Sequence, residues 1–203
     1  SMADVFIGAD VAATWTLDGS NRGNIAGNFQ FSSFENLLGG TASDTFAVAA
    51  NGSLAGKLLG SAGEDHVNLS GKQTSLTATI QGANRGRIVD SAQNLIVDFE
   101  SVENLTGGGS NDFIDRFVVE PLAGLTGKID GGGGSFDHLD YSLWSTAVTV
   151  NLTTGVNQTG VNQTGTVAGI EHITGGSAAD TLTGNSSGNR IIGGGGADTI
   201  DGQ

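Results

Sequence analysis

The chain has 203 residues, enough for one domain with a sizeable core, and its 35 glycines with a single proline indicate many tight turns. It carries 21 Asp and Glu against 8 Lys and Arg, a formal net charge of −13. This excess excludes a nucleic-acid binder, because phosphate contacts need clusters of Lys and Arg. The lack of cysteine excludes disulfides and thiolate sites.

Both ends of the sequence suggest a piece of a longer protein. Ser1-Met2 is interpreted as a cloning scar, and the chain stops within a repeat at Gln203. No apolar run approaches the roughly 20 residues of a membrane span, so no transmembrane segment is expected.

Short apolar segments follow one another along the chain, and none has a helical period. Their lengths and alternating patterns predict β-strands rather than helices. The predicted strands lie within 5–9, 14–19, 29–38, 44–50, 65–70, 76–80, 95–99, 112–119 and 147–152.

A long internal repeat organises these strands. Phe34-Glu35-Asn36-Leu37 recurs as Val102-Glu103-Asn104-Leu105 and as Ile170-Glu171-His172-Ile173, at intervals of 68 residues. We therefore expect one β-solenoid domain over 3–203, built of units at about 14–80, 81–147 and a partial 148–203.

Each unit divides again at turn-like loops. The second residues of these loops are Gly19, Gly40, Ser61, Gly82, Gly108, Gly132, Gly155, Gly176 and Gly194. Their intervals of 18 to 26 residues predict one coil each, three coils a unit and roughly nine in all. The fold class is thus an all-β parallel β-solenoid, in which Leu37 stacks on Leu58 and Phe46 on Val67.

The tail consists of three consecutive nonapeptides, GGSAADTLT (175–183), GNSSGNRII (184–192) and GGGGADTID (193–201). They follow the template G-G-x-G-x-D-x-U-x, in which U is apolar. The glycines allow the positive φ of a tight turn, and the Asp adds a hard anionic oxygen of the kind that Ca²⁺ prefers.

This tail resembles the RTX, or haemolysin-type, calcium-binding repeats of large type I-secreted bacterial surface proteins and adhesins. The resemblance implies a β-helix that passes into an RTX-like β-roll, bound Ca²⁺, and an extracellular or bacterial cell-surface location. The Glu-Asn-Leu-x-Gly-Gly blocks upstream resemble repeats of the same large proteins, more loosely.

Three pairs of stacked loops are the candidate calcium sites: 39–44 on 60–65, 107–112 on 131–137, and 175–180 on 193–198. The predicted ligand residues are Gly175, Asp180, Gly193, Gly195, Asp198, Asp44, Asp65, Asp112 and Asp137. The alternative is that these turns only close the solenoid and that their Asp side chains cap backbone NH groups. For the repeated glutamates, Glu35, Glu103 and Glu171, we expect a hydrogen bond to a neighbouring turn.

We expect no enzymatic activity, because the Asp-His pairs recur with the repeat whereas a catalytic site is usually single. The predicted function is a calcium-binding extension segment of a large secreted or surface protein, next to neighbouring repeats and stabilised by extracellular calcium. One alternative is an adhesin module that binds a glycan or host surface. Another is the β-helix of a carbohydrate lyase or epimerase, for which Tyr141, His138 and Arg116 are the nearest catalytic candidates.

Overall fold

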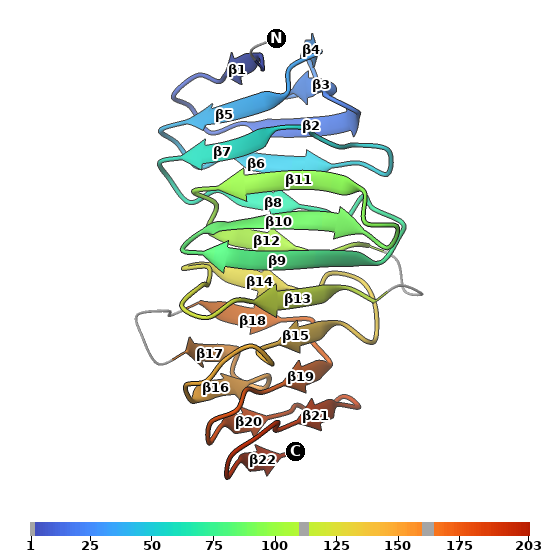
Figure 1. Cartoon of the computed structure of the whole chain (residues 1–203). Helices are drawn as coiled ribbons and strands as arrows, with labels where there is room; N and C mark the ends of the chain where they lie inside the picture. Colours follow the sequence, from blue (N-terminus) through green and yellow to red (C-terminus); the bar gives the residue numbers. More distant parts are fainter. Residues whose placement is uncertain (1–2, 110–113, 160–164) are drawn as a thin grey trace.

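The computed structural model of the chain describes residues 3–109, 114–159 and 165–203. These residues form an all-β rod of two long, largely parallel sheets that face each other, with the chain ends at opposite ends of the rod (Figure 1). This arrangement is consistent with the predicted β-solenoid. None of the described residues belongs to a helix of the length and apolarity needed to cross a membrane.

Sheet A forms the front of the rod in Figure 1, and sheet B forms the back. In spatial order, sheet A contains β1 (Val5–Ile7), β5 (Asn36–Gly40), β7 (Lys57–Ser61), β11 (Leu95–Glu100), β10 (Arg85–Asp90), β9 (Leu76–Gly82), β13 (Arg116–Val119), β15 (His138–Asp140), β19 (His172–Thr174) and β21 (Arg190–Ile192). In the same direction, sheet B contains β4 (Phe29–Ser32), β3 (Arg22–Ile25), β2 (Thr14–Gly19), β6 (Thr45–Val48), β8 (His66–Asn68), β12 (Asn104–Thr106), β14 (Lys128–Asp130), β18 (Thr166–Ala168), β17 (Val156–Thr159), β16 (Val148–Asn151), β20 (Thr181–Thr183) and β22 (Thr199–Asp201).

The core lies between the sheets and is built by stacking equivalent residues of successive coils. Leu37 pairs with Leu58 in sheet A, and Phe46 pairs with Val67 in sheet B, so both predicted pairs are confirmed. All four side chains are fully buried, because strand alternation turns every second residue inward. Trp15, Tyr141 and Trp144, which do not recur in the repeat, are also buried in this core.

Three segments depart from the predicted coil pattern, because they are antiparallel three-stranded meanders within one sheet. The meanders are β2–β3–β4 and β16–β17–β18 in sheet B and β9–β10–β11 in sheet A. The loops at Gly19, Gly82 and Gly155 are therefore hairpin turns, and the prediction that each closes a coil is wrong.

The repeated Gly-x-Asn-Arg-Gly sequence encodes the first hairpin of two meanders. Asn21 and Asn84 have φ of 53°, which Asn tolerates better than other non-glycine residues. The segment 91–97, which lengthens the interval between the loops at Gly82 and Gly108, completes the second hairpin of the β9–β11 meander. The sequence predicts a protruding loop or a widened coil for the tandem VNQTG sequence at 156–165; of this sequence Val156–Thr159 forms β17, and 160–164 lie outside the described residues.

Each meander is followed by four single strands that alternate between the sheets. The meander β2–β4 in sheet B precedes β5 to β8, and the meander β9–β11 in sheet A precedes β12 to β15. Each unit thus makes five passes, one meander and four single strands, and consecutive passes lie in alternate sheets. Because five is an odd number, the next meander lies in the opposite sheet.

Candidate cation site

The two loops of each predicted pair lie against each other, with the first and last pairs at the side of the rod where the chain passes from sheet A to sheet B and the middle pair at the opposite side. The loop 39–44 lies on 60–65, where Gly40 pairs with Ser61. The loop 175–180 lies on 193–198, where the Gly195 amide donates to the Gly176 carbonyl at 2.9 Å. In the middle pair, the Gly133 amide donates to the Gly108 carbonyl at 2.8 Å. The stacking of all three pairs is thus as expected, although Asp112 itself lies outside the described residues.

The loop aspartates form what we call the carboxylate ladder, in which the carboxylate of one coil accepts the backbone NH of the residue stacked on it. The Asp44 NH donates to Asp65 Oδ1 at 2.7 Å, and the Asp180 NH donates to Asp198 Oδ1 at 2.9 Å. The expected capping of backbone NH groups by these side chains is therefore present. This capping uses one oxygen of each carboxylate, Oδ1, and the surroundings of the second oxygen, Oδ2, are described below.

The repeated glutamates extend this ladder on both sides of the rod, Glu103 on the side of Asp65 and Glu171 on the opposite side with Asp137. The NH groups of Asp4, Asp65 and Asp137 donate to Glu35, Glu103 and Glu171, respectively, at 2.7 to 2.9 Å. The predicted hydrogen bond between a glutamate and a neighbouring turn is therefore confirmed for Glu103 and Glu171, whereas Glu35 accepts from the segment before β1.

Asp115 is a ladder residue that the sequence pattern did not identify. Its NH donates to Asp137 Oδ1 at 2.9 Å, so Asp115 takes the place in the stack that was predicted for Asp112. Counting 68 residues from Asp44 selects Asp112, but the loop after Gly107 is longer than its counterparts. The signal that identifies Asp115 is the Asp-x-apolar step into the next strand, as in Asp44-Thr45-Phe46 and Asp115-Arg116-Phe117.

The first glycine of each loop is needed because the second carboxylate oxygen folds back over its α-carbon. A Cβ on Gly60, Gly175 or Gly193 would collide with Oδ2 of Asp65, Asp180 or Asp198, respectively. Positive φ, the expected reason for these glycines, applies instead to later loop positions such as Gly194 and Gly196. Gly195 has neither restriction, since an added Cβ would make only ordinary contacts of 3.4 Å or more.

The second oxygens differ in whether they have a partner. Oδ2 of Asp180 accepts the Gly176 NH at 2.6 Å, and Oδ2 of Asp115 accepts the Gly108 NH. Oδ2 of Asp44, Asp65 and Asp137 is buried without a hydrogen-bond partner among the described residues, although the equally unpartnered Trp15 Nε1 lies near Asp44. These three side chains are at most 2% exposed.

Burial disfavours the charged form of the ladder carboxylates. It raises the pKa of Asp65 to about 6 and the pKa of Asp137 to about 7, and it also raises the pKa of Asp44 and of Asp115. Hydrogen bonds from backbone NH groups oppose this rise but do not cancel it. At neutral pH, the binding of either a proton or a cation would therefore stabilise these buried carboxylates.

The unpartnered oxygens fit a hard cation such as Ca²⁺, which takes six to eight oxygen ligands. Over the described ranges, no three His, Cys, Asp or Glu side chains converge on one point. A Ca²⁺ ion at the Asp44–Asp65 or the Asp115–Asp137 step would thus combine carboxylate oxygens with turn carbonyls and water.

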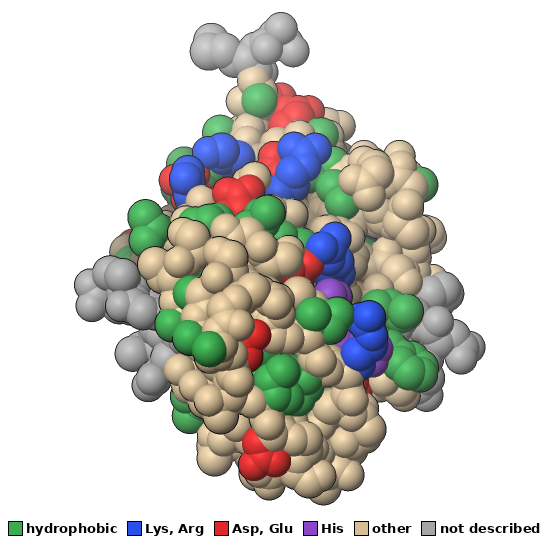
Figure 2. All heavy atoms as spheres, turned by 60° about the horizontal axis from the view of Figure 1, so that its bottom comes forward, with side chains coloured by type: hydrophobic (Ala, Val, Ile, Leu, Met, Phe, Trp, Pro, Cys, Tyr) green, Lys and Arg blue, Asp and Glu red, His purple; other side chains and the backbone are tan. Residues whose placement is uncertain are grey.

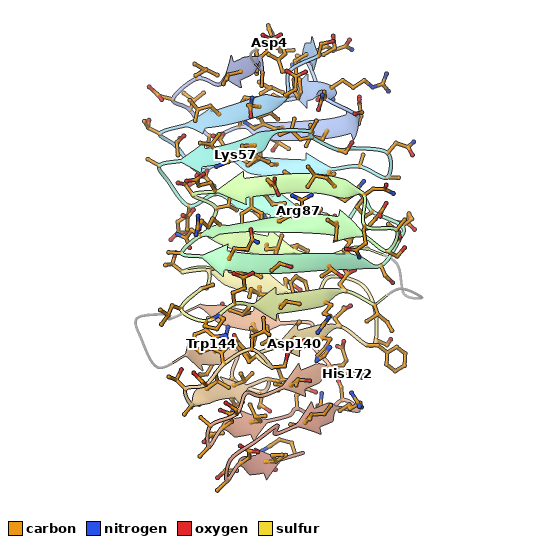
Figure 3. The ribbon with its side chains drawn as sticks, viewed as in Figure 1. Asp4, Lys57, Arg87, Asp140, Trp144 and His172 are labelled. Carbon is orange, nitrogen blue, oxygen red and sulfur yellow. The ribbon has the colours of Figure 1, made fainter. Side chains whose placement is uncertain are left out.

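The three catalytic candidates do not all share one site, because Tyr141 lies in the core whereas Arg116 and His138 are register partners on neighbouring strands of sheet A. Tyr141 is buried and donates its hydroxyl to Asn157 Oδ1 at 2.6 Å, and burial raises its pKa. Arg116 lies on the solvent side of sheet A and pairs with Asp140. His138 Nε2 lies 2.8 Å from Thr174 Oγ1, and burial lowers its pKa. Asp140 and His172 come from neighbouring strands of the front sheet in Figure 3.

Most cations of the chain lie on sheet A. In Figure 2, the Lys, Arg and His side chains in view form an oblique band that crosses the face shown from the upper left to the right. Sheet A supplies Lys57, Arg85, Arg87, Arg116, Arg190, His138 and His172. Three of these cations form ion pairs within the sheet, Lys57 with Glu100, Arg87 with Asp98 and Arg116 with Asp140.

The chain matches no family model, no curated protein and no solved structure.

Proposed function

We propose that the chain is a non-enzymatic structural segment of a large secreted or surface protein, and that Ca²⁺ binding at the carboxylate ladder stabilises its fold. The observation that carries this proposal is the set of buried aspartate oxygens without a partner, on Asp44, Asp65 and Asp137. The ladder runs through stacked coils, so each bound ion would join two coils and stiffen the rod.

The electrostatics of the chain favour a divalent counterion. The net charge of −13 opposes a compact state, and the ionised carboxylates of Asp65 and Asp137 are buried. A cation at these steps would compensate both effects. On this basis, the first sites to fill are the Asp44–Asp65 and Asp115–Asp137 steps, ahead of the Asp180–Asp198 step that best matches the nonapeptide template.

The proposal includes an RTX-like β-roll at the C-terminal end. The four last strands, β19 to β22, begin at residues 172, 181, 190 and 199, nine residues apart, and alternate between the two sheets. Such a regular half-coil fits the nonapeptide repeat. Gly175, Gly193, Asp180 and Asp198 are its proposed turn residues.

The test is the thermal unfolding of the full chain with Ca²⁺, with Mg²⁺ and with a chelator. A ligand that binds only the native state stabilises it by about 2.7 kcal/mol at a hundredfold over Kd, so Ca²⁺ should raise the Tm by several degrees. Asp65→Asn should reduce this rise. The matched control is Asp201→Asn, since Asp201 is exposed and, among the described residues, its carboxylate accepts hydrogen bonds only from Gln203. An unchanged Tm with Ca²⁺ and with chelator would contradict the proposal.

The second candidate function is an adhesin module, and the observation that favours it is the band of cations on sheet A, which would suit an anionic glycan. Of the Lys and Arg residues of the band, Arg85 and Arg190 have no ion-pair partner among the described residues. Retention of the chain on an array of acidic glycans, lost on Arg190→Gln, would support this function.

A further inference from the structure

The N-terminal end of the rod presents two unpaired strand edges. Within the described ranges, β4 pairs only with β3, and β1 pairs only with β5, so each ends its sheet. An unpaired edge exposes a row of backbone NH and C=O groups that can pair with another strand.

In the other two meanders, the strand edge that corresponds to the unpaired edge of β4 is paired with a further strand. The last meander strand β11 is covered by β7, and the last meander strand β18 is covered by β14, in both cases in parallel. The covering strands have similar sequences, Gly56-Lys57-Leu58-Leu59 and Gly127-Lys128-Ile129-Asp130. The strand β4 is the third member of this set and lacks such a cover among the described residues.

The hairpin registers fix how a cover would sit on β4. Arg22 lies opposite Ser32, and the equivalent Arg85 lies opposite Glu100, so Phe31 corresponds to Phe99. Phe99 pairs with Leu58 and Val167 pairs with Ile129, one apolar core residue in each case. A cover on β4 should thus place its Lys opposite Gln30 and its apolar residue opposite Phe31.

An apolar hollow of about 220 Å³ opens beside the two edges. Its lining includes Phe6, Ile7, Val11, Trp15, Ile25 and Phe29. Ile7, Val11 and Phe29 are 65%, 63% and 58% exposed. Phe6 stacks on Leu37, yet it is only partly buried, because none of the described residues forms a coil on its other side.

We propose that this end is an acceptor for a further solenoid coil, which enters as a parallel strand of the Gly-Lys-apolar type along β4. The incoming strand satisfies the backbone groups of the β4 edge, and its coil covers the apolar hollow. The internal contacts β7–β11 and β14–β18 are the two examples of this interface. The proposal does not depend on Ca²⁺, and its test can run in chelator.

The experiment adds a second copy of residues 55–62 to the N-terminus of the full chain through a flexible Gly/Ser linker. The linker makes docking intramolecular, at an effective concentration in the millimolar range. The matched control carries Leu58→Asp in the donor copy only, which removes the apolar residue opposite Phe31. Since the donor lies outside the original chain, neither fusion protein changes the host sequence.

Hydrogen exchange of the β4 amides is the readout. The donor should slow this exchange by about tenfold or more, and the control donor should leave it unchanged. The exchange of β22, which ends sheet B at the other end of the rod, should not change with either donor. Equal protection by both donors, protection of β22 instead of β4, or no protection of β4 would each overturn the proposal.

Discussion

The loop pair at Asp44 and Asp65 and the loop pair at Asp180 and Asp198 share one backbone design but differ in their second carboxylate oxygen. Oδ2 of Asp180 accepts the Gly176 NH, whereas Oδ2 of Asp65 has no partner among the described residues. The strands differ accordingly: β5 and β7 continue into the loop through Gly40 and Ser61 and pair there, whereas β19 and β21 end at Thr174 and Ile192. The loop pair that best matches the nonapeptide template is thus not the pair whose buried carboxylate oxygens would gain most from a cation.

The largest expected effect tests what the two pairs share, the glycine beneath the carboxylate. A Cβ on Gly60 would collide with the Ser101 carbonyl and with Asp65 Oδ2. Gly60→Ala should therefore lower the free energy of unfolding by about 3 kcal/mol in urea titrations. Gly175→Ala should cost a similar amount, because its Cβ would meet Asp180 Oδ2 and the Gly193 carbonyl.

The control for these substitutions is Gly188→Ala, where an added Cβ has no atom within 4 Å. It should change the free energy of unfolding by less than about 1 kcal/mol. If Gly175 accepts Ala as easily as Gly188 does, the two loop pairs differ in their backbone design as well.

The second prediction concerns pH and acts on several ladder carboxylates together. The pKa of Asp65 is raised to about 6 and that of Asp137 to about 7, so the folded state holds these protons more tightly than the unfolded state. Their contribution to stability is fully present below about pH 4 and is lost as the pH rises through 6 to 7. In chelator, the Tm should thus fall between pH 5 and 8.

Two observations would sharpen or contradict this pH dependence. In Ca²⁺, the fall between pH 5 and 8 should shrink or reverse, because the cation competes with the protons for the same oxygens. A Tm that rises with pH in chelator would show that the ladder carboxylates are well compensated without a cation.

The third prediction is that an Asp→Asn substitution changes the free energy of unfolding in opposite directions in the two loop pairs. At pH 8 in chelator, Asp65→Asn should stabilise the fold by about 1 kcal/mol, because it removes a buried charge and can keep the hydrogen bond from the Asp44 NH. Asp180→Asn should cost about 1 to 3 kcal/mol, since both carboxylate oxygens accept backbone NH groups, from Val148 and Gly176. Urea titrations measure both changes. Equal signs would remove the distinction between the pairs.

The smallest expected effect lies at Ser61, which has φ of 83° in the loop of the first pair. The corresponding residue in the last pair is Gly194, with φ of 96°. Ser61→Gly should therefore stabilise the fold by about 0.5 to 1 kcal/mol, a gain that Ser61→Ala should not give. Paired chemical denaturation curves would measure the difference.

Regular spacing made part of this structure predictable. Leu37 and Leu58 are 21 residues apart, as are Phe46 and Val67, and a constant interval brings such pairs into adjacent coils. The loop pairing and the hydrogen bonds of Glu103 and Glu171 followed from the same spacing. The metal content of the loops stays a prediction.

The meanders and Asp115 could not be found by counting. The turn Gly82-Ala83-Asn84 is glycine-rich like a coil loop, although it reverses the chain into an antiparallel partner. Composition does not distinguish the two, since both need residues that tolerate positive φ. Asp115 was missed because the longer loop before it shifts the ladder position by three residues from Asp112.

The alternation of the meanders between the sheets has a consequence for curvature. Each meander places three strands where the facing sheet has one, and two extra strands lengthen one side of the rod by about 10 Å. Such a difference acts as a wedge that bends the rod away from the longer side. Successive wedges point in opposite directions, so the single wedge on sheet A offsets one of the two wedges on sheet B. Removing the β9–β11 meander alone would leave both remaining wedges on sheet B, and the rod should then become an arc.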